Sequence, residues 1–192
     1  TVTPSGAADS NYSVSFVTTT FSITKAPLIV TADSGISKVY GAADPDLTYT
    51  ITGFVSGNEE GDLDTGVSIS RVSGENAGMY TVTPSGAADS NYSVSFVTAD
   101  FSITAKELTI TGLTGDNKVY DGTTDATASG TPVLSGLVSD DDVVLGGTPV
   151  FTFASANVGT GITINTTGLT ISGTDIGNYT LTQPTLSGDI TA

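Results

Sequence analysis

Residues Thr81–Thr98 read TVTPSGAADSNYSVSFVT, and residues Thr1–Thr18 read the same, letter for letter, 81 − 1 = 80 positions earlier. Within this stretch Tyr92, Val94 and Phe96 are separated by serines. They share one face if the segment is extended, because side chains alternate across a strand. The stretch therefore predicts a β-strand, and its repetition at a fixed distance predicts tandem modules.

Weaker markers recur in one order in the two halves of the remaining chain. KVYG at 38–41 returns as KVYDG at 118–122, GFVS at 53–56 as GLVS at 136–139, NAG at 76–78 as NVG at 157–159, and NYSV at 91–94 as NYTL at 178–181. We therefore expect two divergent modules of one topology, called here the first module (25–104) and the second module (105–192). Residues 1–24 are interpreted as the C-terminal strands of a preceding, truncated repeat, and the abrupt start indicates an excerpt of a longer chain.

Alternating apolar and hydroxyl side chains continue through both modules, for example at 47–52, 67–70, 151–153 and 162–164. This period of two is typical of half-buried antiparallel strands, and turn-forming residues lie between the runs. Gly, Ser, Thr and Val dominate, and all of them form helices poorly. The sequence therefore predicts an all-β chain of tandem Ig-like β-sandwich modules with Greek-key connections.

The apolar positions of these strands form the expected cores. The first core is predicted to contain Leu28, Val30, Val39, Leu47, Ile51, Phe54, Val67, Ile69, Val82, Tyr92, Val94, Phe101 and Ile103. The second is predicted to contain Leu108, Ile110, Val119, Leu145, Phe151, Phe153, Ile162, Ile164, Leu169, Ile171, Tyr179, Leu181 and Ile190. No Gly/Ser linker separates the modules, so we expect little rotation between them and a stiff array.

Composition excludes several classes of function. The 192 residues include no Cys or His, which excludes thiol chemistry, a Ser-His-Asp triad and Cys- or His-ligated metals. The formal net charge of −15 opposes binding to nucleic acids and to anionic membrane surfaces. No run approaches the roughly 20 apolar residues of a spanning helix. We therefore expect no enzyme, no nucleic-acid binding and no membrane insertion.

The ordered motifs of the two modules carry a family resemblance. KVYG (38–41), DPDLTY (44–49), GFVSG (53–57), NAGMY (76–80), NYSV (91–94) and the closing FSIT (101–104) resemble the MBG domain, a bacterial Ig-like module. KVYDGTT (118–124), GLVS (136–139), NVG (157–159) and GNYTL (177–181) resemble the YDG domain. The resemblance implies repeats of large secreted or surface-attached bacterial proteins, often adhesin-like, and it brings no catalytic residues with it.

The lysines of the KVY motif have two interpretations. Lys38 or Lys118, buried beside Asn91 or Asn178 and a carboxyl group, could form an isopeptide crosslink with loss of ammonia. In the alternative, which we favour, Val and Tyr pack while the lysine lies along the surface with its ammonium group in water.

Tyr92 and Tyr179 each follow a turn and begin a predicted strand. A buried tyrosine at such a corner is expected to form a hydrogen bond with the backbone across it, as in the tyrosine corner of Ig folds. This assigns the Asn-Tyr motif a structural role.

Acidic side chains gather in two matching loops and are the weak candidates for a metal site. Calcium takes about six to eight oxygen ligands, and none of the spacings fits an EF-hand loop. The alternative is a solvated acidic surface. No cofactor is expected, and the calcium candidates are Glu59, Glu60, Asp62, Asp64, Asp140, Asp141 and Asp142.

Two functions follow from these features. As structural stalk modules, the chain would project the distal binding region of a secreted or cell-surface bacterial adhesin, with neighbouring repeats as its partners. As a ligand-binding module, its loops would recognise a glycan or a host surface protein. A glycosidase-like carboxylate pair is disfavoured, because the acids lie in turns.

Residues 1–24 have too few strands to bury a core alone. We expect them to rest against a neighbour, or to swap into the place of residues 81–104 in a second copy.

Overall fold

The computed structural model describes all 192 residues, and close contacts divide them into two compact units. The first unit consists of residues 1–32, 48–70 and 83–98, and the second of residues 33–47, 71–82 and 99–192. The only helical elements are two single turns of 3-10 helix, η1 (Glu60–Asp62) and η2 (Ile176–Asn178). No helix in the structure has the length and hydropathy needed to cross a membrane. The predicted all-β fold is confirmed.

Strand β1 (Ala26–Ala32) is the centre of a three-stranded sheet in the first module. It pairs antiparallel with β3 (Tyr49–Thr52) and parallel with β6 (Tyr92–Val97). Alternate residues of β1 face inward, so that Leu28 and Val30 are fully buried. The antiparallel prediction is wrong for β6, because alternation reports which face is buried and not the direction of the neighbouring strand.

The other sheet of the first module has the strand order β2–β7–β5–β4. Its members are β2 (Ser37–Val39), β4 (Ser68–Arg71), β5 (Gly78–Ser85) and β7 (Ala99–Thr104). Strand β7 is parallel to β2 and antiparallel to β5. Val82, Phe101 and Ile103 have almost no exposed surface, so this sheet has one buried apolar face.

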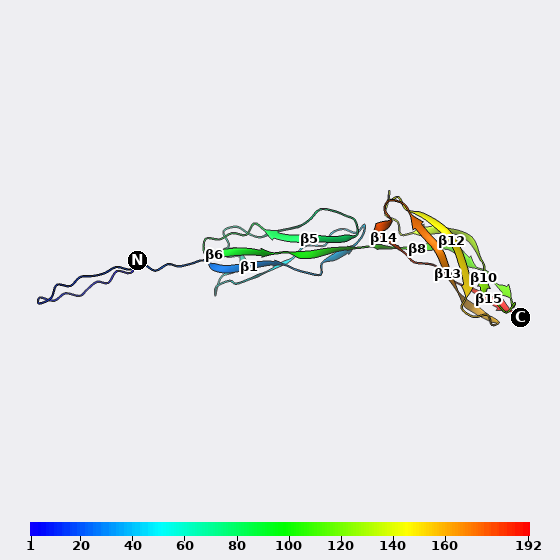
Figure 1. The fold of residues 1–192 in the computed structure, drawn as a ribbon, viewed down its shortest axis with the longest axis horizontal. Coiled ribbons are helices and arrows are strands. Elements are labelled where there is room, and N and C mark those ends of the chain that lie inside the picture. The colour runs from blue at the N-terminus through cyan, green and yellow to red at the C-terminus, as the bar shows by residue number, and fades with distance from the viewer. The chain divides into compact units, whose positions relative to one another are not determined.

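The second module repeats this connection order. One sheet has the order β11–β8–β14, with β8 (Lys106–Gly115) between β11 (Ala128–Ser135) and β14 (Tyr179–Leu181). The other has the order β10–β12–β13–β15–β9 and contains β9 (Lys118–Val119), β10 (Asp125–Ala126), β12 (Val144–Phe153), β13 (Gly159–Ser172) and β15 (Thr185–Thr191). Strands β10, β12, β13 and β15 are labelled in Figure 1. In both modules the last strand is parallel to the KVY strand, and the strand after the Asn-Tyr turn is parallel to the first. The predicted common topology is confirmed for the strands that the two modules share, and β10 is an additional edge strand of the second module.

Most predicted core positions are buried or half-buried. In the second module, one buried cluster contains Leu108, Val143 and Tyr179, and another contains Phe153, Ile164 and Ile190. The prediction is wrong for Val39 and Val119, which are 47% and 66% exposed. Each follows the lysine of the KVY motif, and neighbouring residues of a strand point to opposite faces. A lysine that turns inward therefore turns the valine outward.

Residues 1–24 are exposed along their whole length. Val2 and Thr19 exchange two backbone hydrogen bonds of 2.7 and 3.2 Å, which bring the two arms of the segment together. Phe21 and Ile23 are 68% and 88% exposed. The docking or strand swap of this segment stays a prediction.

Candidate functional site

Lys38 lies in the short strand β2 and points into the protein. Strand β2 pairs with β7 so that Lys38 lies opposite Ile103, and the Lys38 carbonyl accepts a hydrogen bond from the Thr104 hydroxyl at 3.2 Å. Only 4% of the Lys38 side chain is exposed. The interpretation that this ammonium group lies in water is therefore wrong. A buried charge requires charged partners, because removing it from water is costly.

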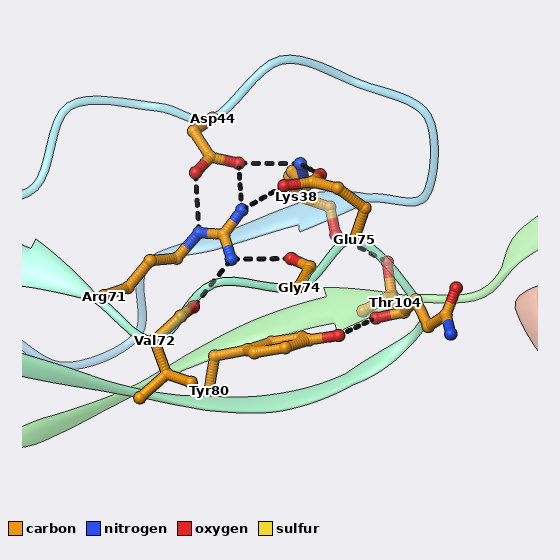
Figure 2. Close-up of polar contacts among 9 residues, drawn as sticks. Lys38, Asp44, Arg71, Val72, Gly74, Glu75, Tyr80 and Thr104 are labelled. Atoms are coloured by element: carbon orange, nitrogen blue, oxygen red, sulfur yellow. Dashed lines mark hydrogen bonds and ion pairs between the residues drawn. The ribbon is translucent and has the colours of Figure 1, made fainter.

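Two carboxylates bind the Lys38 ammonium group, and the Arg71 guanidinium group binds the same two carboxylates (Figure 2). Lys38 Nζ lies 2.6 Å from Asp44 Oδ1 and also binds Glu75 Oε2. Arg71 donates through Nε and Nη2 to the two oxygens of Asp44 at 2.6 and 3.0 Å, and through Nη2 to Glu75 Oε1 at 2.6 Å. These four residues, called here the Lys38 cluster, form a closed network of two positive and two negative charges.

Arg71 also has partners outside the carboxylates. Its Nη1 donates to the backbone carbonyls of Val72 at 3.0 Å and Gly74 at 2.7 Å. Its central carbon lies 5.3 Å from the ring centre of Tyr80 and 5.0 Å from that of Phe101, within the range of cation–π attraction. The guanidinium group is therefore held by hydrogen bonds and by attraction to two aromatic rings.

The cluster shifts the ionisation of its own members. Hydrogen bonds from Arg71, and then from Lys38, lower the pKa of the Asp44 carboxyl group from 3.8 to about 2. Hydrogen bonds from Lys38, and then from Arg71, lower the pKa of Glu75. The bonds to Asp44 and Glu75 raise the pKa of Lys38, against the opposing effect of burial. All four groups are therefore charged at neutral pH, and none is poised to exchange a proton there.

The second module holds the lysine of the same motif differently. Lys118 Nζ donates to Asp121 Oδ1 at 2.8 Å, and to the carbonyl and the hydroxyl of Thr123 at 2.9 and 3.1 Å. The hydrogen bond from Lys118, followed by the one from the Thr123 amide, lowers the pKa of Asp121 to about 2. Lys118 Nζ also lies 5.7 Å from the ring centre of Phe153. A single local turn thus neutralises this lysine.

Asn178, one candidate for the disfavoured isopeptide crosslink, binds elsewhere. Its Oδ1 accepts a hydrogen bond from the Ala77 amide at 2.8 Å, and its Nδ2 donates to Asn76 Oδ1 at 3.4 Å. Asn91, the other candidate asparagine, is exposed at its turn. The lysines of both motifs bind carboxylates instead, so the structure favours ion pairs over a crosslink.

The two tyrosines of the Asn-Tyr motifs occupy matching corners. Tyr92 Oη accepts a hydrogen bond from the Val55 amide at 3.0 Å, and Tyr179 Oη accepts one from the Val138 amide at 2.9 Å. Both tyrosines are buried. The predicted hydrogen bond between tyrosine and backbone across a corner is confirmed in both modules.

Tyr40, from the first KVYG motif, packs onto the second of these corners. Its ring meets that of Tyr179 edge-on, with centroids 5.3 Å apart and an interplanar angle of 77°. It also packs against the buried cluster that contains Leu108. The Tyr40 hydroxyl donates to Asp141 Oδ2 at 2.9 Å, and the Tyr179 hydroxyl donates to the same carboxylate. Burial, and then Asp141, raise the pKa of Tyr179 to about 12.

Two further contacts complete this contact surface. Gly41 lies so close to Val138 that a Cβ atom on the glycine would be 2.6 Å from Val138 Cγ2. The Ala77 amide donates to Asn178, as described above. This surface is called here the joint, and it contains Tyr40, Gly41 and Ala77 from the first module and Val138, Asp141, Asn178 and Tyr179 from the second. All of these residues belong to the second compact unit.

Comparison with protein families identifies both modules. A model of the MBG domain (YGX type) matches residues 28–102, and a model of the YDG domain matches residues 104–186. The chain contains an MBG domain followed in tandem by a YDG domain. A comparison with curated proteins finds none that matches it.

The acidic candidates of the MBG domain form local hydrogen bonds. Glu60 accepts from the Tyr49 hydroxyl, Asp62 from the Glu59 amide at 2.9 Å, and Asp64 from the Ser90 amide at 2.8 Å. These contacts fasten the loop around η1.

The acidic candidates of the YDG domain lie in the matching loop. Asp141 binds two tyrosine hydroxyls of the joint, and Asp142 accepts from the Thr174 amide at 3.1 Å. Asp140 adopts the left-handed backbone conformation, with φ of 71°. No three acidic side chains of the chain come together as a group able to hold a metal ion. The expectation of no metal and the calcium alternative both stay untested predictions.

Arg71 and Glu75 are the site residues that the sequence motifs of the MBG domain do not reveal. They lie outside the KVYG motif, and only folding brings them to Lys38. One signal was present: Arg71 is the only arginine in a chain with 20 acidic residues. A planar group with several donors is well suited to link two carboxylates.

Proposed function

We propose that these two domains are structural stalk modules of a large bacterial surface adhesin, in which they project a distal binding region. The observation that carries the proposal is the joint. A spacer must keep each module in a fixed orientation relative to the next. Tyr40 and Ala77 fix turns of the MBG domain against the YDG corner, whereas a flexible linker would leave the domains free to rotate.

The charges of the chain support a passive, non-enzymatic role. The charged members of the Lys38 cluster neutralise one another. Their ion pairs therefore hold the loops of the MBG domain together and leave no member available for catalysis. The net charge of −15 favours solubility and repulsion between neighbouring stalks, as suits a crowded cell surface.

Adhesion by cells that carry the whole protein tests this proposal. Deletion of residues 25–192 should lower adhesion, because the distal region would lie closer to the cell. Replacement by two unrelated β-sandwich domains of equal length should restore adhesion, since a spacer contributes only length and stiffness. Replacement that leaves adhesion as low as deletion would overturn the stalk role, and would favour recognition of a glycan or a host protein by these domains.

A further inference from the structure

The YDG corner that receives Tyr40 has a counterpart in the MBG domain. Val55, Asn91 and Tyr92 hold the sequence positions of Val138, Asn178 and Tyr179. The two corner loops share their backbone conformation as well: φ is 104° at Gly53 and 102° at Gly136, and 89° at Gly57 and 71° at Asp140. In each loop the valine amide donates to the tyrosine hydroxyl. The two corners are therefore built alike.

The two corners differ in what covers them. Val55 is 55% exposed, whereas Val138 is half-buried in the joint. Asn91 is exposed, whereas Asn178 is 5% exposed and binds the Ala77 amide. The MBG corner thus presents the groups that the joint uses, without the turns that cover them there.

We propose that this MBG corner, called here the open corner (Val55, Asn91 and Tyr92), is the docking site for the KVYG and NAG turns of a preceding module of the same repeat. The inference rests on the proposed role in a repeat array. The occupant follows from the sequence, because residues 1–18 are identical to 81–98 and residues 21–24 to 101–104. The segment before Lys25 is therefore the end of a near copy of this MBG domain.

The covalent tether has the right length for this docking. Strand register places Ala26 beside Tyr92 and Lys106 beside Tyr179, so Ala26 and Lys106 are equivalent positions. One FSIT motif ends at Thr24 and the other at Thr104, and Ala26 and Lys106 each lie two residues after the end of their motif. A preceding module would thus be held at the open corner by the same number of residues that hold the MBG domain at the joint.

The chemistry of the open corner fits the same turns. A pocket of about 250 Å³ is present there, lined by Val55, Ser90 and Asn91 together with residues 23–26. Asn58 holds the position of Asp141, and its side-chain carbonyl can accept a hydrogen bond from a tyrosine hydroxyl. The Asn91 side-chain carbonyl can accept one from a backbone amide, as Asn178 does in the joint.

The corresponding turns of the YDG domain are exposed. Tyr120 and Val158 hold the positions of Tyr40 and Ala77, and they are 53% and 54% exposed. The insertion of Asp121 after Tyr120 alters that turn, so the proposal is confined to the open corner.

A chain with residues 25–80 added in front of Thr1 tests the proposal, because residues 1–24 then supply the last strands of a complete preceding module. The protein lacks Cys, so an engineered pair reports a single contact. In the joint, Val138 Cβ lies 3.7 Å from a Cβ placed on Gly41, within the roughly 3.5–4.5 Å that a disulfide spans. Gly41→Cys with Val138→Cys is therefore the positive control, and Gly41→Cys in the added segment with Val55→Cys is the test pair.

Both pairs should close to similar extents under mild oxidation, as seen by intact mass and electrophoretic mobility. A third pair, Gly41→Cys in the added segment with Val72→Cys at an exposed position elsewhere, should stay reduced. Closure of the control pair without closure of the Val55 pair would overturn the proposal.

NMR spectroscopy of the chain without engineered cysteines tests the same docking, and its outcome does not depend on whether the cysteine variants fold. Addition of residues 25–80 should shift the NMR signals of the Val55 methyl groups and the Asn91 side-chain amide, and Tyr40→Ala in the added segment should reverse the shift. Signals that do not move would also overturn the docking site. That result would leave the joint and the adhesion experiment untouched, so it is distinguishable from failure of the stalk role.

Discussion

The KVY motif occurs in both domains, and its lysine has a different environment in each. In the MBG domain, Lys38 binds the carboxylates of Asp44 and Glu75, which lie 6 (44 − 38) and 37 (75 − 38) positions away. Arg71 binds the same two carboxylates. In the YDG domain, Lys118 binds a carboxylate three positions away, in its own turn. The inserted Asp121 supplies this carboxylate. The comparison teaches that one motif can either tie distant loops together or stabilise only the turn that contains it.

The largest expected effect is the loss of Arg71. Arg71→Met should lower the free energy of unfolding of the MBG domain by about 2 kcal/mol, because the buried guanidinium group loses its two-point contact with the half-exposed Asp44 and leaves the Val72 and Gly74 carbonyls without their donor. Hydrogen exchange of the β5 and β7 amides measures this loss within the MBG domain.

Arg71→Lys is the matched control for this variant. It keeps the charge but loses the two-point contact with Asp44, so it should be destabilised by an intermediate amount. An Arg71→Met variant as stable as the unmodified chain would show that the Lys38 cluster contributes no more than the Lys118 turn.

The joint should be sensitive to one hydroxyl group. Tyr40→Phe removes the hydrogen bond to Asp141, and hydrogen bonds to charged groups contribute about 1.5–3 kcal/mol. We expect a loss near the lower end of this range, about 1.5 kcal/mol, since Asp141 keeps the Tyr179 hydroxyl. Tyr120→Phe, at an exposed tyrosine of the same motif, should change stability by less than about 0.5 kcal/mol. Urea unfolding measures both, and equal losses would contradict the joint.

Acid should weaken the MBG domain in a defined window. The pKa of Asp44 in the folded chain is about 2, below its ordinary value of 3.8, so the unfolded chain binds protons first as the pH falls. The stability contributed by Asp44 is therefore present above pH 3.8 and is lost as the pH falls towards 2. Thermal melting across this window should show a falling Tm, and Asp44→Asn should flatten that dependence. An unchanged slope in Asp44→Asn would assign acid sensitivity to other carboxylates.

The smallest expected effect is the loss of Lys118. Lys118→Met removes one ion pair in which Asp121 is 53% exposed, and such pairs contribute at most about 1 kcal/mol. Hydrogen exchange of the β9 and β15 amides should therefore change little. A loss as large as that of Arg71→Met would remove the distinction between the two lysines.

The sequence predicts the fold well, because the fold depends on local pattern. Alternation marks the buried face of β1, and the Asn-Tyr motifs mark the corners at Tyr92 and Tyr179. The pattern misplaces Val39 and Val119, because a lysine is expected to point outward and these strands turn it inward. Hydropathy alone does not reveal that a charge is neutralised by residues from other loops.

The site depends on contacts between residues far apart in the chain, and the sequence does not predict which residues form these contacts. The partnership of Lys38 with Glu75 and Arg71 needs β2 to lie near the turn between β4 and β5. The partnership of Tyr40 with Asp141 spans 101 positions (141 − 40) and crosses from one domain to the next. A short junction predicts that the domains are close, but it does not identify the side chains that meet.

The most direct test of the joint is a measurement of relative motion. Residual dipolar couplings of the amides in residues 33–47 and 71–82, and of those in residues 106–191, report the orientation of the two sets in one aligned sample. A single alignment tensor should fit both sets, and Tyr40→Ala combined with Asn178→Ala should make them fit separately. Two different tensors for the unmodified chain would contradict the fixed joint on which the proposed stalk depends.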